Sequence, residues 1–205
     1  MFRVPMAMLP EVCDSAFYFG DACVGAFENS PTAITGVAGD QQAALVGQCA
    51  FKPGALKSTY GTGCFVLANT GTIALSSKHR LLTTIAYRLN GITHYGIEGS
   101  IFIAGAAVQW LRDELNFISD AGDTEAILNS TPLHHGVVVV PAFTGLGAPH
   151  WSADSRGAVF GLKRNSGRNE IISATLQSIA LQTDDLLQAM NDDGLTITEF
   201  KVDGG

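Results

Sequence analysis

One aspartate in this 205-residue chain stands where a carboxylate could serve in catalysis. Asp40 follows the apolar run Ala33–Ala38, which predicts a short buried strand, and precedes Gln41–Ala50, which predicts a helix. Ligands of α/β sheets collect at the carboxyl ends of strands, so a carboxylate at that place is a candidate general base. Aspartate is also a preferred helix N-cap, and position alone favours the cap.

A glycine-rich turn offers a different chemistry. Tyr60-Gly61-Thr62-Gly63 joins two predicted strands, Lys57–Tyr60 and Cys64–Asn69. Glycines let backbone N–H groups face an anion, and the Thr62 hydroxyl adds a donor, so the turn could cradle a phosphate. An ordinary hairpin turn explains the same pattern and is favoured before other observations. Phe65, just after the turn, forms either an apolar wall of a site or part of the core.

Gly105 and Gln109 lie four residues apart in the predicted helix Ile101–Leu115 and therefore share a face. A glycine inside a helix costs about 1 kcal/mol relative to alanine. The residues next to Gly105 are alanines, so alanine is tolerated nearby and the glycine needs a reason. Close approach by a ligand or by another helix supplies one, and the sequence weighs the two equally.

Common motifs of nucleotide binding and nucleophilic catalysis are absent from the sequence. It has neither Gly-x-x-x-x-Gly-Lys-Ser/Thr nor Gly-x-Gly-x-x-Gly, and it has no Gly-x-Ser-x-Gly. Four cysteines without a Cys-x-x-Cys pair predict reduced thiols in the cytoplasm rather than disulfides or a zinc site. They are Cys13, Cys23, Cys49 and Cys64.

The composition narrows the class of protein further. The formal net charge of −7 argues against a nucleic-acid-binding protein. The apolar runs Ile101–Val108 and Val137–Phe143 are far shorter than the roughly 18 residues of a membrane-spanning helix. Charged residues make up only 15% of the chain, against about 25% in typical globular domains, which indicates that another surface covers part of this one.

The remaining elements must position these residues. Helical spacing predicts Asp123–Asn129 and a long helix through Ile172–Met190 that stops at Gly194. Residues 143–155, rich in Gly and Pro, predict a loop. Antiparallel hairpins followed by alternating strands and helices predict an α/β sheet covered by helices. The further predicted strands are Leu82–Leu89, Thr93–Ile97, Val137–Val140, Ala158–Leu162 and Phe200–Asp203.

Six stretches in order resemble the glycerol kinases of the FGGY carbohydrate kinase family, along essentially the whole chain. Gln41-Gln42 after Asp40 is typical of the glycerol kinases, whereas sugar kinases of the family vary these positions. The resemblance implies an actin-like ATPase, ribonuclease-H-like α/β fold with a mixed sheet flanked by helices, incomplete at its C-terminal end. The stretches are Gly36–Leu45, Ser58–Phe65, Glu98–Asp113, Pro141–Pro149, Gly157–Gln177 and Val202–Gly205.

The resemblance also implies a reaction, the transfer of the γ-phosphoryl group of ATP to the terminal hydroxyl of glycerol with Mg²⁺. Asp40 becomes the general base and a glycerol ligand, Gln41 a hydrogen-bond partner of glycerol, and Phe65 a contact of its carbon skeleton. No residue is implied as a direct metal ligand, and Asp40 reaches the ion only through water. The implied nucleotide contacts are Thr62, Gly63, Gly105, Gln109, Gly204 and Gly205.

Residues 1–205 resemble the second, nucleotide-side domain of these two-domain kinases. The predicted last strand runs into Gly204-Gly205, which predicts a further element and hence a piece of a longer polypeptide, inactive without its first domain. Family members inhibited by fructose bisphosphate carry a loop with Lys and Arg before the substrate motif. Gly20–Glu28 has neither residue, which predicts weak or absent inhibition.

Two alternatives accompany the glycerol kinase hypothesis. The first keeps the family and changes the substrate to another small polyol or sugar. The second is a non-catalytic nucleotide-binding or subunit-interaction module on the same fold. The expected partners are glycerol, ATP or ADP, and the missing first domain, without nucleic acid or a membrane span. Homo-oligomer formation stays open, and the expected location is the cytoplasm.

Overall fold

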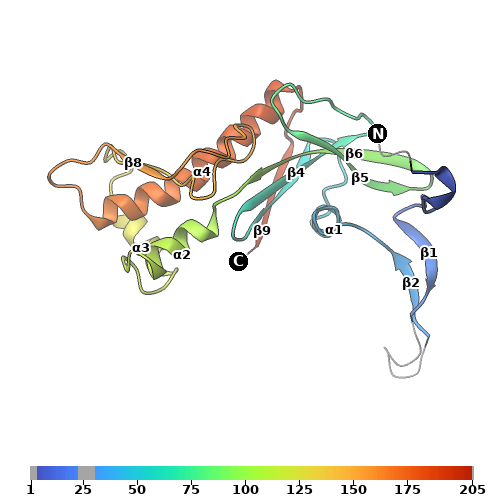
Figure 1. Ribbon diagram of the computed structural model, residues 1–205, viewed down its shortest axis with the longest axis horizontal. Helices are drawn as coiled ribbons and strands as arrows, with labels where there is room; N and C mark the ends of the chain where they lie inside the picture. The colour runs from blue at the N-terminus through green and yellow to red at the C-terminus, as the bar shows by residue number, and fades with distance from the viewer. Residues whose placement is uncertain (1–3, 23–30, 205) are drawn as a thin grey trace.

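A computed structural model describes residues 4–22 and 31–204, which form a five-stranded mixed sheet, two two-stranded ribbons and four α-helices (Figure 1). Cys23, most of the segment Gly20–Glu28 and Gly205 lie outside the described residues. The strands are β1 (Ala16–Asp21), β2 (Ala33–Gly36), β3 (Ala55–Tyr60), β4 (Cys64–Gly71), β5 (Leu82–Leu89), β6 (Ile92–Ile101), β7 (Val138–Val140), β8 (Ala158–Phe160) and β9 (Glu199–Gly204). The helices are the 3₁₀ turn Met6–Met8 and the α-helices α1 (Asp40–Gly47), α2 (Gly105–Asp113), α3 (Asp123–Ser130) and α4 (Arg168–Asp192).

The five-stranded sheet has the order β5-β6-β4-β3-β9. β3 and β9 run parallel, and every other neighbouring pair is antiparallel. Tyr60 faces Cys64 across the turn between β3 and β4, which is the hairpin that the glycine pattern predicts. The parallel pair joins segments far apart in the sequence, so β9 completes a sheet that the earlier hairpins begin. The predicted mixed α/β fold is confirmed.

Helices cover both faces of this sheet because successive strand side chains point to opposite sides. On one face Leu56, Val66 and Ile97 pack against Leu186 and Met190 of α4, with all five side chains buried. On the other face α1 places Leu45 in a second cluster of buried residues that includes Ala55 and Leu67 of the sheet. The second cluster is smaller, and it shares its face of the sheet with polar groups.

Helix α4 is the longest element, and its ends follow from its sequence. The Glu170 carboxylate accepts a hydrogen bond from the N–H of the N-cap Gly167 (2.8 Å). Past the C-terminal end, Gly194 has a φ of +93°, a conformation that favours glycine, as the predicted stop requires. Figure 1 shows α2, α3 and β8 gathered around the N-terminal end of α4, away from β5. No helix among the described residues is long and apolar enough to cross a bilayer.

Two predictions about secondary structure need correction. The predicted buried strand Ala33–Ala38 is β2, which ends at Gly36 and is exposed along its length, because it pairs only with β1 in a ribbon that projects from the sheet (Figure 1). The helix predicted to begin at Ile101 begins at Gly105. Ile101 instead closes β6, where it pairs with Cys64 of β4.

The other predicted elements lie at or near their expected positions. Strand β5 has the predicted bounds, and α3 begins at the predicted Asp123. Predicted loop residues 143–155 form no named helix or strand. The 3₁₀ turn Met6–Met8 and strand β1, which no pattern in the sequence indicates, are additions among the described residues.

Candidate active site

Asp40 is the first residue of α1 and is not its cap. Gly39 is the N-cap residue, in an extended conformation. The Asp40 side chain is exposed, and its Oδ1 accepts a hydrogen bond from the N–H of Gln41 (2.8 Å). A carboxylate in the first turn of a helix also interacts favourably with the helix dipole. The Asp40 carboxylate is therefore exposed to solvent, and the cap interpretation of Asp40 is wrong.

A small pocket lies next to Asp40: the following residue, Gln41, lines it, whereas Asp40 itself is not among the lining residues. Its volume is about 240 Å³. Gln41 and Phe65, which the resemblance assigns to the same substrate, both line it, and Phe65 is 47% exposed. The pocket combines apolar and polar walls, as a site for a small polar molecule with a carbon skeleton would. The remaining lining residues are Val66, Leu82, Glu98, Gly99 and Ser100.

A buried lysine lies behind this pocket. Lys57 of β3 is fully buried, and its Nζ donates hydrogen bonds to the Gln41 side-chain oxygen, to Thr59 Oγ1 (2.9 Å) and to the Phe65 carbonyl (3.4 Å). Burial lowers the pKa of Lys57, and this effect outweighs the nearby carboxylates, which raise it. The lysine therefore holds Gln41 from beneath the pocket.

Glu98 adds a carboxylate to the wall of the pocket. The strand register places Lys57 opposite Leu67, and Leu67 opposite Glu98, so all three side chains share the α1 face of the sheet. Burial raises the pKa of Glu98, Lys57 lowers it, and Asp40 raises it. Asp40, Glu98 and Lys57 are therefore close enough to influence one another electrostatically.

Sequence reasoning missed Lys57 and Glu98. The signal that could have found them is the register of the β3–β4 hairpin. Once the turn places Tyr60 opposite Cys64, the alternation of strand residues puts Lys57 and Phe65 on one face of the sheet.

The turn Gly61-Thr62-Gly63 is anchored to the start of α2. The Gly61 carbonyl accepts a hydrogen bond from the Gly105 N–H (2.8 Å), and the Thr62 carbonyl accepts one from Ala104 (2.8 Å). Thr62 itself is exposed, whereas Gly63 is buried. A Cβ on Gly63 would lie 2.4 Å from the Ile101 carbonyl oxygen, so packing against β6 requires glycine there.

The reason for the helical glycine at position 105 differs from both alternatives weighed on the sequence. A Cβ on Gly105 would lie 2.6 Å from the Gly61 carbonyl oxygen. The close neighbour is therefore the backbone of the β3–β4 turn, and neither another helix nor a ligand is needed to explain the glycine. The contact fixes the turn relative to α2.

A second hollow, of about 420 Å³, opens on the other side of the turn. It brings together Gly105 at the start of α2, Gly61 of the turn, and Asp203 and Gly204 of β9. Gln109 does not line this hollow. It is exposed and borders a separate depression of about 250 Å³ with Trp110 and Asp113.

A chain of side-chain hydrogen bonds links residues at the two hollows. Thr59 and Asp203 face one another in the β3–β9 ladder. Hydrogen bonding from Thr59 lowers the pKa of Asp203 most, and Gln48, whose Nε2 donates to Asp203 Oδ2 (2.8 Å), lowers it further. Since Lys57 also donates to Thr59, polar contacts extend from Gln41 at the first pocket to Asp203 at the second hollow.

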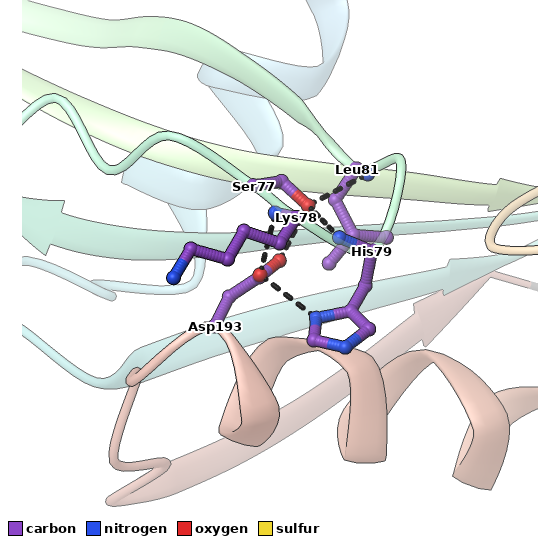
Figure 2. Close-up of polar contacts among 5 residues, drawn as sticks. All are labelled: Ser77, Lys78, His79, Leu81 and Asp193. Carbon is purple, nitrogen blue, oxygen red and sulfur yellow. Dashed lines mark hydrogen bonds and ion pairs between the residues drawn. The ribbon is translucent and has the colours of Figure 1, made fainter.

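A cluster of Ser77, His79 and Asp193 contains the residue types of a nucleophilic triad in another arrangement (Figure 2). The Ser77 hydroxyl donates to the Asp193 carboxylate, and His79 Nδ1 lies 2.8 Å from the same carboxylate. The Lys78 N–H donates to it as well (2.7 Å). Asp193 thus stands between the serine and the imidazole, so His79 is not placed to activate Ser77. The cluster fastens the loop before β5 to the C-terminal end of α4.

Comparison with protein families identifies the kind of domain to which this geometry corresponds. Residues 56–205 match the model of the C-terminal domain of the FGGY family of carbohydrate kinases. The matched part contains Lys57, the glycine turn, α2 and β9.

Individual relatives extend the similarity to the whole chain. A glycerol kinase of Rhodospirillum centenum is 57% identical over all of this chain, and one of Brucella ovis is 58% identical over 98% of it. The chain spans about 41% of the length of these curated relatives.

Solved structures agree with the fold. A crystal structure of Plasmodium falciparum glycerol kinase with ADP matches with a TM-score of 0.89 and 37% identity, over 98% of this chain and 40% of that one. A xylulose kinase from Rhodospirillum rubrum has a TM-score of 0.79 over 97% of this chain and 41% of that one, at 22% identity, which supports the shared fold alone.

Proposed function

Because this chain belongs to the FGGY family of carbohydrate kinases, we propose that it is the nucleotide-side domain of a longer kinase that phosphorylates glycerol. The observation that carries the proposal is the small pocket beside the exposed Asp40, with Gln41 as a polar wall and Phe65 as an apolar one. Relatives named glycerol kinase, more than 50% identical over the whole chain, support this substrate. The other domain of the kinase supplies the rest of the cleft.

In this proposal Asp40 is the general base. As the new bond forms between the terminal oxygen of glycerol and the γ-phosphorus of ATP, the bond from that phosphorus to the bridging oxygen breaks and ADP leaves. The proton of the attacking hydroxyl passes to Asp40. An alcohol loses its proton far above neutral pH, so the carboxylate accepts it only as the bond to phosphorus develops. Positioning and charge stabilisation supply most of the catalysis.

The proposed nucleotide side is the hollow between the turn, α2 and β9. Gly61, Gly105 and Gly204 line it, so backbone groups form much of its wall. Thr62 lies exposed at the tip of the turn, and in the sequence it stands between Gly61, which lines this hollow, and Phe65, which lines the substrate pocket. The ADP in the Plasmodium falciparum relative supports nucleotide use. Gly63, Gln109 and Gly205 remain proposed contacts from the resemblance alone.

Magnesium fits this arrangement as a companion of the nucleotide. The described residues contain no cluster of three or more His, Cys, Asp or Glu side chains that could hold a metal ion. Mg²⁺ commonly keeps several waters and binds through one or two carboxylates together with substrate phosphates. The exposed Asp40 carboxylate could contact such an ion through water. When bound, the ion would neutralise charge that develops on the phosphate oxygens.

Replacing the proposed base tests the function in the full-length protein. Asp40→Asn should lower kcat by about 10²–10⁴-fold, the usual contribution of a general acid or base, while ATP affinity stays within twofold. Asp184→Asn, on the exposed surface of α4, is the matched control and should leave kcat unchanged. An Asp40→Asn enzyme that keeps more than about a tenth of the wild-type kcat would contradict the assignment of the base.

A substrate panel on the same protein distinguishes the alternatives. Glycerol should give the highest kcat/KM among small polyols and sugars. A higher value for another polyol would keep the family and change the substrate, and no turnover with any of them would favour the non-catalytic module. This chain alone is expected to lack turnover at the roughly 1–100 s⁻¹ typical of kinases, because half of the cleft is missing. The cytoplasmic location stays a prediction, and cell fractionation tests it.

A further inference from the structure

A fully buried ammonium is an unusual feature of the sheet. Lys57 is the largest side chain among those that are completely enclosed in the described residues, and lysines are rarely buried unless they are paired. No carboxylate within the described part of the chain lies close enough to Lys57 for an ion pair. Its charge is instead surrounded at longer range by Asp40, Glu98 and Asp203, which come from three separate elements. Burying an ammonium group without an ion-pair partner costs free energy, so its presence requires a reason beyond packing.

The contacts of Lys57 point to Gln41. An ammonium can only donate hydrogen bonds, so the atom of Gln41 that it contacts is the carbonyl oxygen of the side chain. That contact fixes the orientation of the amide, because the alternative would set two donors against one another. The NH₂ group of Gln41 is then the end left free for the pocket that Gln41 lines.

The other contacts hold Lys57 in place. Thr59 and the Phe65 carbonyl accept from the same ammonium, and they belong to the two strands that flank the glycine turn. Thr59 in turn faces Asp203 of β9. Lys57 is therefore anchored on the strands of the phosphate-side turn and reaches α1 only through Gln41.

We infer that Lys57 is a positioning residue for the acceptor substrate, because it fixes the Gln41 side chain with its NH₂ group toward the pocket, where that group donates to a hydroxyl oxygen of the polyol. The inference rests on the proposed function and extends it to a residue that does not touch the substrate. Its main consequence is that Lys57 acts on the acceptor through one direct contact, with Gln41, whereas it reaches the nucleotide side only indirectly, through Thr59 and Asp203.

A double-mutant cycle in the full-length enzyme tests the inference. Lys57→Met removes the charge and all three hydrogen bonds at similar length, and should raise the KM for glycerol about tenfold while the KM for ATP stays within twofold. Gln41→Ala should raise the KM for glycerol by at least as much. The double variant should be little worse than Gln41→Ala alone, because the Gln41 side chain is the polar group of the pocket that Lys57 holds, whereas its contact with Phe65 is only to the backbone carbonyl.

Lys201→Met is the matched control. Lys201 lies opposite Lys57 in the β3–β9 ladder, but its Nζ donates to the Gln48 carbonyl (2.6 Å) and makes no contact with Gln41. It should leave the KM for glycerol unchanged. Lys57→Arg, which retains charge and donors, should restore most of the glycerol affinity. If Lys57→Met yields no folded protein, Lys57→Gln replaces it in the cycle under the same criteria.

The outcomes separate this inference from the proposed function. Effects of Lys57→Met and Gln41→Ala that multiply in the double variant, or equal changes in the KM for glycerol and for ATP, would assign Lys57 a general structural role and overturn the inference. Wild-type enzyme that does not phosphorylate glycerol would refute the proposed function instead. The cycle is then measured with the best acceptor of the substrate panel, and the same criteria decide.

Discussion

The two faces of the five-stranded sheet are made by the same strands but differ in chemistry. On the face under α4, Leu56, Val66 and Ile97 meet Leu186 and Met190 without a charged group among the buried residues of the cluster, and the buried polar groups there, such as those of Ser58 and Thr183, are neutral hydroxyls. The face under α1 contains a buried lysine, a buried asparagine and a half-buried glutamate, which are Lys57, Asn69 and Glu98. Because strand residues alternate, each strand contributes to both faces.

This difference assigns separate tasks to the two faces. Burial of apolar surface stabilises a fold by about 25 cal/mol per Å², and the α4 face is where this chain concentrates it. A buried charge costs free energy unless it is paired and hydrogen bonded, so a face that contains a buried lysine serves more than stability. The α1 face has Asp40 and Gln41 at its edge. Substitutions should therefore affect unfolding on one face and turnover on the other.

The largest effect on stability is expected at the centre of the α4 face. Leu186→Ala should lower the free energy of unfolding by about 2–5 kcal/mol, since Leu186 is fully buried and a cavity would remain. The KM for glycerol should not change in the folded enzyme. Denaturant unfolding of the full-length protein measures the loss. Leu181→Ala, on the same helix and 58% exposed, is the control and should cost no more than about 0.5 kcal/mol. Equal losses at both leucines would contradict the contrast between the faces.

Loss of the Asp193 carboxylate, at the end of the α4 face, should have an intermediate effect on the free energy of unfolding. Burial raises the pKa of Asp193, but hydrogen bonds from Ser77, Lys78 and His79 outweigh it and hold that pKa below its ordinary value of 3.8. The carboxylate therefore stabilises the fold above pH 3.8, and this contribution is lost as the pH falls through the lower, folded value. Asp193→Asn should cost about 1.5–3 kcal/mol at pH 7, as for hydrogen bonds to a charged group.

The pH dependence identifies the cause of that loss. Urea unfolding between pH 7 and pH 3 should show the difference between wild type and Asp193→Asn shrinking at the acid end. Asp192→Asn, at the neighbouring exposed position, should match wild type throughout. A difference that is constant with pH would mean that packing, and not the charge of Asp193, joins the loop to α4.

The smallest effect on stability is expected from a substitution on the α1 face, at Glu98. Burial raises the pKa of Glu98 above its ordinary value of 4.5, so the protonated form is favoured in the fold. Any stability from this shift is present below pH 4.5 and is lost as the pH rises through the folded value. Glu98→Gln should therefore be more stable than wild type at neutral pH, by about 0.5 kcal/mol, the usual size for partly exposed positions. The two proteins should unfold alike below pH 4.5.

Thermal denaturation from below pH 4.5 to neutral pH checks whether Glu98→Gln is more or less stable than wild type. A Glu98→Gln protein that is less stable than wild type at neutral pH would show that attraction between Glu98 and Lys57 exceeds the cost of burial. The charges of the α1 face would then stabilise the fold, and the division between the faces would be less sharp than the packing indicates.

The sequence predicts most of the local structure because its signals are local. The glycine turn at Gly61 and the alternation on either side specify the β3–β4 hairpin, and the spacing through Ile172–Met190 specifies α4. The predicted start of α2 is wrong because the apolar run Ile101–Val108 continues without a break from a buried strand into a helix. Periodicity cannot divide such a run. The division comes from hydrogen bonds between the start of α2 and the turn, which are tertiary contacts.

The site was predicted from resemblance more than from pattern. Asp40, Gln41 and Phe65 do lie at or next to one pocket, although position in the sequence alone favoured a cap for Asp40 and left Phe65 open. Lys57 escaped notice because a lysine in a strand ordinarily faces solvent. Its burial depends on α1 above it and on β9 beside it, and β9 is joined to β3 only by tertiary structure.

The pairing of β3 with β9 also has a consequence during synthesis. The ribosome makes about 5–20 residues per second, so β3 and β4 emerge many seconds before β9 can join them. Throughout that interval the edge of β3 is open, and an open edge invites pairing with strands of other nascent chains. Lys57, in the middle of that edge strand, carries its charge in water at this stage and opposes such pairing. We therefore expect Lys57 to oppose aggregation of the nascent chain until β9 pairs with β3.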